Sequence, residues 1–364
     1  MLQKFHKLHT LYAITSLGIF LTNIDDIIEI EDFTYKNELS GEHIQAENIY
    51  SPFSITSLDS LLIVTEDDAV ENEIIKIFDQ RDYENISYYG RRGDGPGEIS
   101  GMPSIISSYN SEYLSYFDFE RKRVSNIAME KILSGEHYTE PDDYHLFSPD
   151  KMMLQRAHLI DDYLVIAGTG MQEGKLLFHN PEKDTSLYKP FTPDYSDIDF
   201  LPHNVGIVYS SSKGVSHNNE RVAVFNHRFP QFEIYDFNGR IRAKIEFDDG
   251  SEPKFSDQQT PLYSETMNYY KDVEVTEENI YALYQGEKQV TIYGDAPDVQ
   301  GEPREPDHDA INSEVHVYSW DGEPQERYIL DRYIRKIAVN EHKNSLIGLD
   351  PNSLEKPLVE FEIK

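Results

Sequence analysis

The chain has 364 residues, with 66 acidic against 33 basic side chains and a formal net charge of −33 at pH 7. Such a surface repels phosphate backbones, and the densest basic groups, at 91–92 and 121–123, are too small to form a basic patch, so we expect no nucleic-acid partner. The chain contains no cysteine, which excludes disulfides, cysteine zinc sites, a catalytic thiol and a lipid-modified cysteine. Frequent Tyr, Phe, Gly and Pro favour many short strands over long helices.

Residues 1–23 have the design of a secretory signal. Lys4 and Lys7 precede an apolar run over 11–21. As a helix this run would span about 17 Å, against roughly 30 Å of hydrocarbon in a bilayer. It is too short to cross comfortably, and nothing else in the chain is apolar enough for an integral membrane span. We therefore expect an exported, periplasmic or secreted protein that is not a lipoprotein. Because no small-residue cleavage site follows, an amphipathic or disordered leader is the alternative.

From residue 27 onward, hydrophobic and polar residues alternate between turns, and one pattern recurs. Six segments consist of an acidic or polar turn followed by a hydrophobic strand. Their equivalent positions are Leu62, Leu114, Leu164, Val222, Ile280 and Leu346, which are separated by steps of 52, 50, 58, 58 and 66 residues. Repeats of this length match the blades of a β-propeller with insertions.

Several of these units continue with a strand that ends in an Asp or Asn turn and a further strand, as at 232–239. In the fifth unit, residues 281–284, 314–319 and 328–330 predict three strands, the last two joined by a turn at Asp321-Gly322. Each unit thus offers about four strands. We predict an all-β fold over 27–364, a six-bladed β-propeller of four-stranded antiparallel blades; a β-sandwich or an open solenoid is the alternative.

Strand-like segments also lie near both ends of the domain, at 357–363 and 28–33. We expect one or both to complete a shared blade, so that the N- and C-terminal strands close the ring by hydrogen bonds. Deleting the last eight residues should then destabilise the whole domain.

A glycine-rich stretch at 90–99 links the first unit to the second. Its four glycines, at 90, 93, 95 and 97, precede Pro103 and an apolar strand, which resembles the inter-blade loop of NHL-type propellers. Together with the C-terminal segments at 270–275, 280–284, 315–322 and 337–340, the chain resembles bacterial TolB-like six-bladed propellers. This resemblance implies the propeller fold and an exported or envelope-attached protein, and it does not indicate an activity.

Loops from several blades converge at the mouth of a propeller channel, which is where function concentrates in such folds. We predict a monomeric binding or scaffold module that recognises a protein, peptide or glycan through its loop-rich face. The longest connections are 135–151, 249–269 and 285–312. The candidate binding residues are Arg91, Arg92, Asp94, Glu98, His217 and Tyr270.

The alternative is an enzyme. The architecture resembles lactonase-like propellers, which hold a divalent cation, calcium, among channel carboxylates and use it to polarise a carbonyl. The nearest local cluster of metal-ligand types is Asp307, His308 and Asp309, in a Pro-, Gly- and acid-rich insertion where a solvated loop is the simpler interpretation. No catalytic residue can be assigned, so we favour a binding module over an enzyme and keep a metal-assisted hydrolase or lyase as the alternative.

Overall fold

The computed structural model describes residues 27–67, 73–106, 112–146, 154–160, 163–168, 174–180, 183, 185–194, 205–206, 208–247, 267–288 and 312–363. The predicted signal segment and the cluster Asp307, His308 and Asp309 lie outside these residues. Within the described part, no helix is long and apolar enough to span a membrane.

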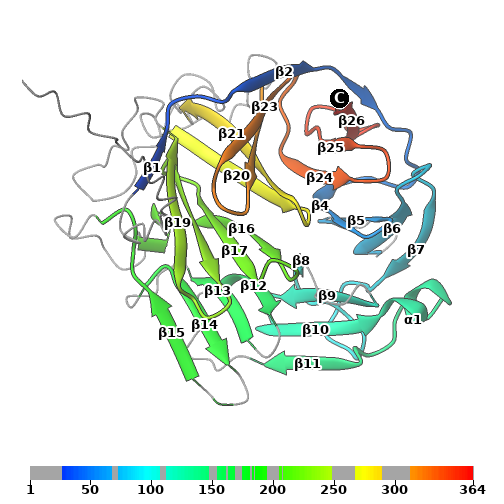
Figure 1. The fold of residues 1–364 in the computed structure, drawn as a ribbon. Coiled ribbons are helices and arrows are strands. Elements are labelled where there is room, and N and C mark those ends of the chain that lie inside the picture. Colours follow the sequence, from blue (N-terminus) through cyan, green and yellow to red (C-terminus); the bar gives the residue numbers. More distant parts are fainter. Residues whose placement is uncertain are drawn as a thin grey trace, which may run out of the picture.

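Six β-sheets are arranged around a central axis as the blades of a propeller (Figure 1). Apart from the strands that the N-terminal segment adds at the outer edges, the first strand of each blade lies at the channel and the following strands lie progressively further out. The first blade is β4 (Pro52–Leu58), β5 (Leu61–Glu66), β6 (Ile75–Asp79) and β7 (Asn85–Tyr89). The second is β8 (Pro103–Ile106), β9 (Tyr113–Asp118), β10 (Arg123–Ala128) and β11 (Asp143–Leu146). The third is β12 (Leu154–Ile160), β13 (Tyr163–Gly168), β14 (Leu176–Asn180) and β15 (Thr185–Lys189).

The remaining three blades follow the same order. The fourth is β16 (Ser211–Ser216), β17 (Arg221–Asn226), β18 (Gln231–Asp236) and β19 (Ile241–Phe247). The fifth is β20 (Met267–Val275), β21 (Asn279–Lys288), β22 (Glu314–Ser319) and β23 (Pro324–Leu330). The sixth is β24 (Lys336–Asn340), β25 (Ser345–Leu349) and β26 (Leu358–Glu362), completed by a strand from the N-terminal segment. The predicted six-bladed all-β fold is confirmed.

The N-terminal segment forms a belt of three strands around the outer edges of three successive blades, and Figure 1 shows it in blue. β1 (Ile27–Ile30) pairs in parallel with β19, and β2 (Tyr35–Leu39) pairs in parallel with β23. β3 (Gly41–His43) then pairs antiparallel with β26. The fourth and fifth blades therefore have five strands instead of the predicted four.

The sixth blade joins the two ends of the domain, as predicted, but through a different N-terminal segment. Its outer strand is Gly41–His43, whereas Ile27–Ile30 adds to the fourth blade. Of the two segments expected to complete a shared blade, 357–363 does so and 28–33 does not. The alternation of hydrophobic and polar residues predicts that one face of this strand is buried, and Ile30 is indeed buried. The same alternation does not identify the strand with which it pairs.

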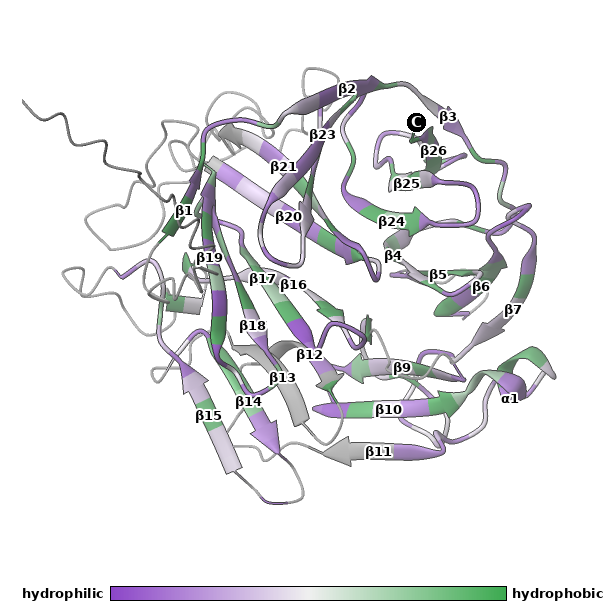
Figure 2. Cartoon of the chain, in the orientation of Figure 1, coloured by the Kyte–Doolittle hydropathy of each residue, from purple (hydrophilic) through white to green (hydrophobic). Residues whose placement is uncertain are grey.

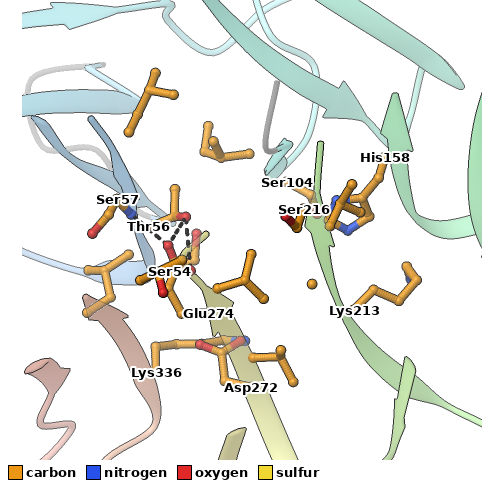
Figure 3. A pocket seen from close by; sticks show the side chains of 18 of the residues that line it. Ser54, Thr56, Ser57, Ser104, His158, Lys213, Ser216, Asp272, Glu274 and Lys336 are labelled. Atoms are coloured by element: carbon orange, nitrogen blue, oxygen red, sulfur yellow. Dashed lines mark hydrogen bonds and ion pairs between the residues drawn. The ribbon is translucent and has the colours of Figure 1, made fainter. Parts of the chain in front are cut away.

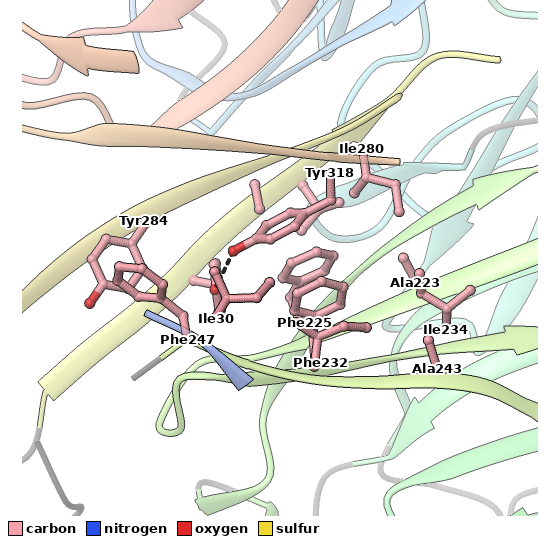
Figure 4. Close-up of a cluster of buried hydrophobic side chains, with 14 of the residues drawn as sticks. Ile30, Ala223, Phe225, Phe232, Ile234, Ala243, Phe247, Ile280, Tyr284 and Tyr318 are labelled. Atoms are coloured by element: carbon pink, nitrogen blue, oxygen red, sulfur yellow. Dashed lines mark hydrogen bonds between the residues drawn. The ribbon is translucent and has the colours of Figure 1, made fainter. Parts of the chain in front are cut away.

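Aromatic side chains fill the space between the blades. Between the fourth and fifth blades, Phe225 and Phe232 stack with ring centroids 4.0 Å apart, and Tyr318 packs against Phe232 at 4.7 Å (Figure 4). Phe33, from the belt, reaches the same cluster and lies 5.4 Å from the Tyr318 ring. Figure 2 shows hydrophobic residues along the strands of the blades, whereas the belt strand β2 is mostly hydrophilic. The belt is thus anchored at a few buried points.

The two ends of the propeller differ in the connections that they carry. Because successive strands run in opposite directions, the turns between the first and second strands of all blades lie at one end, which we call the hairpin end. The connections from one blade to the next lie at the other end, which we call the connector end. The short helix α1 (Met129–Leu133) leaves the second blade and packs beside β7, where Ser87 Oγ donates a hydrogen bond to Ile132 O at 2.7 Å.

Candidate binding site in the central channel

The central channel contains a hollow of about 360 Å³, lined by the first strand of every blade (Figure 3). Its wall mixes apolar side chains, such as Ile55 and Val273, with hydroxyl groups and charged groups. A concave site with a few convergent polar groups on a rigid scaffold is the usual form of a small-ligand site. We therefore treat this hollow as the candidate site.

Glu274 extends from β20 toward β4 of the first blade. The Thr56 hydroxyl donates to its two carboxyl oxygens at 3.0 and 3.1 Å, and the Ser57 N–H donates to Oε1 at 3.0 Å. Both donors belong to β4 of the first blade, so the contact spans the first strand of the sixth blade. Burial, with a smaller contribution from the neighbouring Asp272, raises the pKa of Glu274 to about 8, against the opposing effects of Ser57, Thr56 and Lys336. At neutral pH this carboxyl group is mostly protonated.

An ion pair forms a second part of the wall. Lys336 Nζ lies 2.6 Å from Asp272 Oδ1, and the Ile337 N–H donates to Asp272 Oδ2 at 3.1 Å. Both charged side chains are buried, so each neutralises the other in a site that water reaches poorly. Beside this pair, burial lowers the pKa of Lys271 to about 8, with smaller contributions from the positive charges of Arg228 and Lys336.

The facing wall is built by the second, third and fourth blades. Lys213 on β16 is 5% exposed and His158 on β12 is 8% exposed, and both line the hollow. Ser104 and Ser216 lie nearby (Figure 3). The hollow therefore has Glu274, Asp272 and Lys336 on one side and Lys213 and His158 on the other.

Carboxylates surround the mouth of the hollow at the hairpin end. Asp59, Glu277 and Glu341 line it, from turns of the first, fifth and sixth blades. Burial raises the pKa of Glu341, and the negative charges of Glu277 and Glu278 raise it further. Glu277 is positioned by the fourth blade, because Asn219 Nδ2 donates to its main-chain oxygen at 2.6 Å.

Two of the candidate binding residues lie near the channel or the neighbouring core. His217 lines the hollow at the hairpin end. Tyr270 is fully buried, and its hydroxyl lies 3.0 Å from the Tyr318 hydroxyl within the aromatic core, so it packs between blades. A tyrosine in an alternating strand looks the same in the sequence whichever face it occupies.

The other four candidates lie in the glycine-rich loop, at the connector end. Arg91 pairs with Glu98 at 2.7 Å, and the Gly95 N–H donates to Glu98 at 2.7 Å. The hydrogen bond from Gly95 and the positive charge of Arg91 both lower the pKa of Glu98. Arg92 donates to Asp67 O at 2.6 Å, and the side chain of Asp94 is 93% exposed. These contacts organise the loop itself, at the end of the propeller opposite His217. As binding residues they stay predictions.

The sequence carried a signal for the channel residues that was missed. On β20, Asp272 and Glu274 alternate with Val273 and Val275, so two carboxyl groups occupy one face of a strand whose other face is apolar. In a surface strand this pattern is ordinary. It indicates a channel site only once β20 is known to be the innermost strand of its blade.

Calcium does not fit the described channel carboxylates. Asp272 is paired with Lys336, and Glu274 is held by Thr56 and Ser57. Among the residues that the structure describes, no group of three or more His, Asp or Glu side chains could hold a metal ion. A calcium site needs six or more oxygen ligands, so these residues give no step for metal-assisted hydrolysis.

The fold and the channel hollow define a six-bladed propeller with a polar central site. A model of the TolB-like 6-blade propeller-like family matches residues 32–342, and the chain belongs to this family.

Two of the solved structures that match the chain show the shared fold. One is a member of the DUF4221 family from Bacteroides vulgatus, with a TM-score of 0.55 and 12% identity over 89% of this chain and 97% of that one. The other is a protein from Bacteroides fragilis described as a candidate exported protein, with a TM-score of 0.54 and 13% identity over 93% of this chain and all of that one. No curated protein matches the chain. At these identities the likeness concerns the fold alone.

Proposed function

We propose that this protein is an extracytoplasmic binding module that holds a short polar ligand, the end of a peptide or of a glycan chain, in the hollow of its channel. The observation that carries this proposal is the hollow of about 360 Å³ to which the first strands of all six blades contribute polar side chains. Six rigid strands position these groups at little entropic cost on binding.

An extracytoplasmic location rests on the signal-like segment 1–23 and agrees with the description of the similar B. fragilis protein as a candidate exported protein. The propeller over 27–364 would then act as a free monomer in the periplasm or outside the cell. The glycine-rich loop, with its NHL-like glycine spacing, would serve the scaffold. The alternative function, a calcium-dependent hydrolase, is not favoured by the channel carboxylates that the structure describes.

The test compares the two ends of the propeller. Peptide and glycan arrays are screened with the wild type, with Ser104→Trp, which fills the hollow, and with Ser353→Trp. Ser353 lines a smaller pocket of about 150 Å³ at the connector end and gives a matched control. Melting temperatures confirm that both variants fold.

We expect Ser104→Trp to weaken binding of the selected ligands at least about tenfold, which corresponds to about 1.4 kcal/mol. Ser353→Trp should retain the wild-type affinity. Loss of binding in Ser353→Trp with retention in Ser104→Trp would move the site to the connector end and contradict the proposal.

A further inference from the structure

We propose that the ligand presents a primary ammonium group, which enters the hollow from the hairpin end and forms an ion pair with Glu274. This inference rests on the proposed function and specifies the ligand chemistry of the same hollow. A lysine side chain, a peptide amino terminus and a polyamine all carry such a group.

The first reason is the sign of the charges around the hollow. Five carboxyl groups line it, against two lysines. One of these lysines, Lys336, is already neutralised by Asp272 at 2.6 Å. At the mouth, Asp59, Glu277 and Glu341 come from three different blades, and the whole chain carries a net charge of −33. A cation is therefore attracted to this end of the channel and an anion is repelled.

The second reason is the hydrogen bonding of Glu274. An ionised carboxylate offers about four acceptor positions. Within the described part of the chain, two groups donate to Glu274, the Thr56 hydroxyl and the Ser57 N–H. Glu274 is only partly buried and lines the hollow, so its carboxyl group borders the space that a ligand would occupy. An ammonium group carries three N–H donors and complements this remaining capacity.

The third reason is that Glu274 can respond to a cation by ionising. The titratable groups near it are Asp272 on its own strand and Lys336 on β24, with Lys213 on β16 and His158 on β12 across the hollow. Burial raises the pKa of Glu274 to about 8. An ammonium group beside it favours the carboxylate and so lowers this pKa. Binding at pH 7 then releases the carboxyl proton to solvent, about 0.9 proton per ligand if ionisation becomes complete.

The experiment is titration calorimetry on the full chain at pH 7, in phosphate and in Tris, whose heats of protonation differ. The probes are cadaverine for the polyamine source and acetyl-Gly-Lys-Gly-amide for the peptide source. The same peptide with an Nε-acetylated lysine lacks the charge. The variants are Glu274→Gln, which retains the size and neutrality of the protonated side chain, and Glu362→Gln, an exposed carboxylate on β26 outside the hollow, as the matched control.

We expect at least one amine probe to bind the wild type with release of about 0.5–0.9 proton, and the acetylated peptide to bind at least about tenfold more weakly. Glu274→Gln should bind the amine without proton release and at least about tenfold more weakly than the wild type. Glu362→Gln should behave as the wild type. Glu341→Gln, at the mouth, provides a second variant and should weaken binding at low salt more than at high salt.

Two results would overturn the inference: no binding of either amine probe, or binding without proton release that Glu274→Gln leaves unchanged. The array screen separates this failure from failure of the proposed function. If neutral or acidic ligands bind and Ser104→Trp removes them, the channel site stands and the ammonium chemistry is wrong. If no ligand depends on Ser104, the channel site itself is wrong.

Discussion

Thr56 and Glu274 lie 218 positions apart in the chain, on blades that are not neighbours, and the Thr56 hydroxyl donates to the Glu274 carboxyl group at 3.0 Å. The contact crosses the first strand of the sixth blade and so connects three blades at the channel. It also places a half-buried carboxyl group where its charge is costly.

The first prediction concerns the pH dependence of stability. The pKa of Glu274 is about 8 in the folded state, above its ordinary value of about 4.3 in the unfolded chain. The protonated side chain therefore stabilises the fold fully below about pH 4.3, and this contribution is lost as the pH rises to about 8. Relative to Glu274→Gln, the wild-type free energy of unfolding should fall by about 2–4 kcal/mol between pH 5 and 8.5.

Urea denaturation of both proteins at several pH values measures this difference. Lys271, whose pKa is lowered to about 8, contributes its own slope only above that pH and is present in both proteins. Parallel stability curves for the two proteins between pH 5 and 8.5 would show that Glu274 ionises normally.

The second prediction tests the closure of the ring at Gly41. A Cβ at this position would lie 2.3 Å from Val359 Cγ1 and 2.6 Å from the Phe361 ring, so β3 could no longer pack against β26 without movement. Gly41→Ala should destabilise the domain by about 1–3 kcal/mol. Gly101→Ala is the control, because its Cβ would meet only the flexible side chain of Glu120. Equal melting temperatures for Gly41→Ala and the wild type would argue against this closure.

The third prediction concerns the belt. Phe33 is 4% exposed and packs against His316 at 4.7 Å and Phe247 at 5.8 Å. Phe33→Ala should cost about 3–4 kcal/mol of stability, since a large aromatic side chain leaves a cavity in the core. Tyr35→Ala, two positions along the belt at 65% exposure, should change the melting temperature little. If both variants melt alike, the belt does not stabilise the fourth and fifth blades through Phe33.

The fourth prediction concerns the glycine-rich loop. Arg121 donates hydrogen bonds to Glu98 O at 2.5 Å, Gly93 O at 3.1 Å and Gly95 O at 3.4 Å, which fixes the loop from the β9–β10 turn. Arg121→Met should destabilise the domain by about 1–2 kcal/mol and speed amide hydrogen exchange in 91–98. Arg91→Met should have a smaller effect because the Arg91 side chain is 51% exposed. Unchanged exchange in Arg121→Met would show that the loop holds its own conformation.

Much of the scaffold could be predicted because each blade repeats one local pattern. The six residues aligned in the sequence, from Leu62 to Leu346, each occupy the second position of the second strand of a blade. The turn at Asp321-Gly322 was predicted as well, and Gly322 has a φ of +88°, which glycine adopts without strain. These features depend on neighbours in the chain, and neighbours are what a sequence pattern records.

The candidate site depends on contacts between distant segments, and the sequence did not predict it. Lys336 and Asp272 pair across two blades, and Glu274 reaches the first blade, so their meeting follows only from the closed ring. For the same reason the sequence did not distinguish Gly41–His43 from 28–33 as the closing strand. Tyr270 and His217 were chosen by residue type, and only the fold shows that the first is core and the second lines the hollow.

The most direct test of the channel site is a carbon-13 NMR titration of the Glu274 side-chain carboxyl carbon, assigned with Glu274→Gln, in the absence and presence of saturating cadaverine. The structure predicts a midpoint near pH 8 for the protein alone, and a midpoint lower by at least about one pH unit with the amine. A midpoint near the ordinary value of about 4.3 in both titrations would contradict the site proposed for this channel.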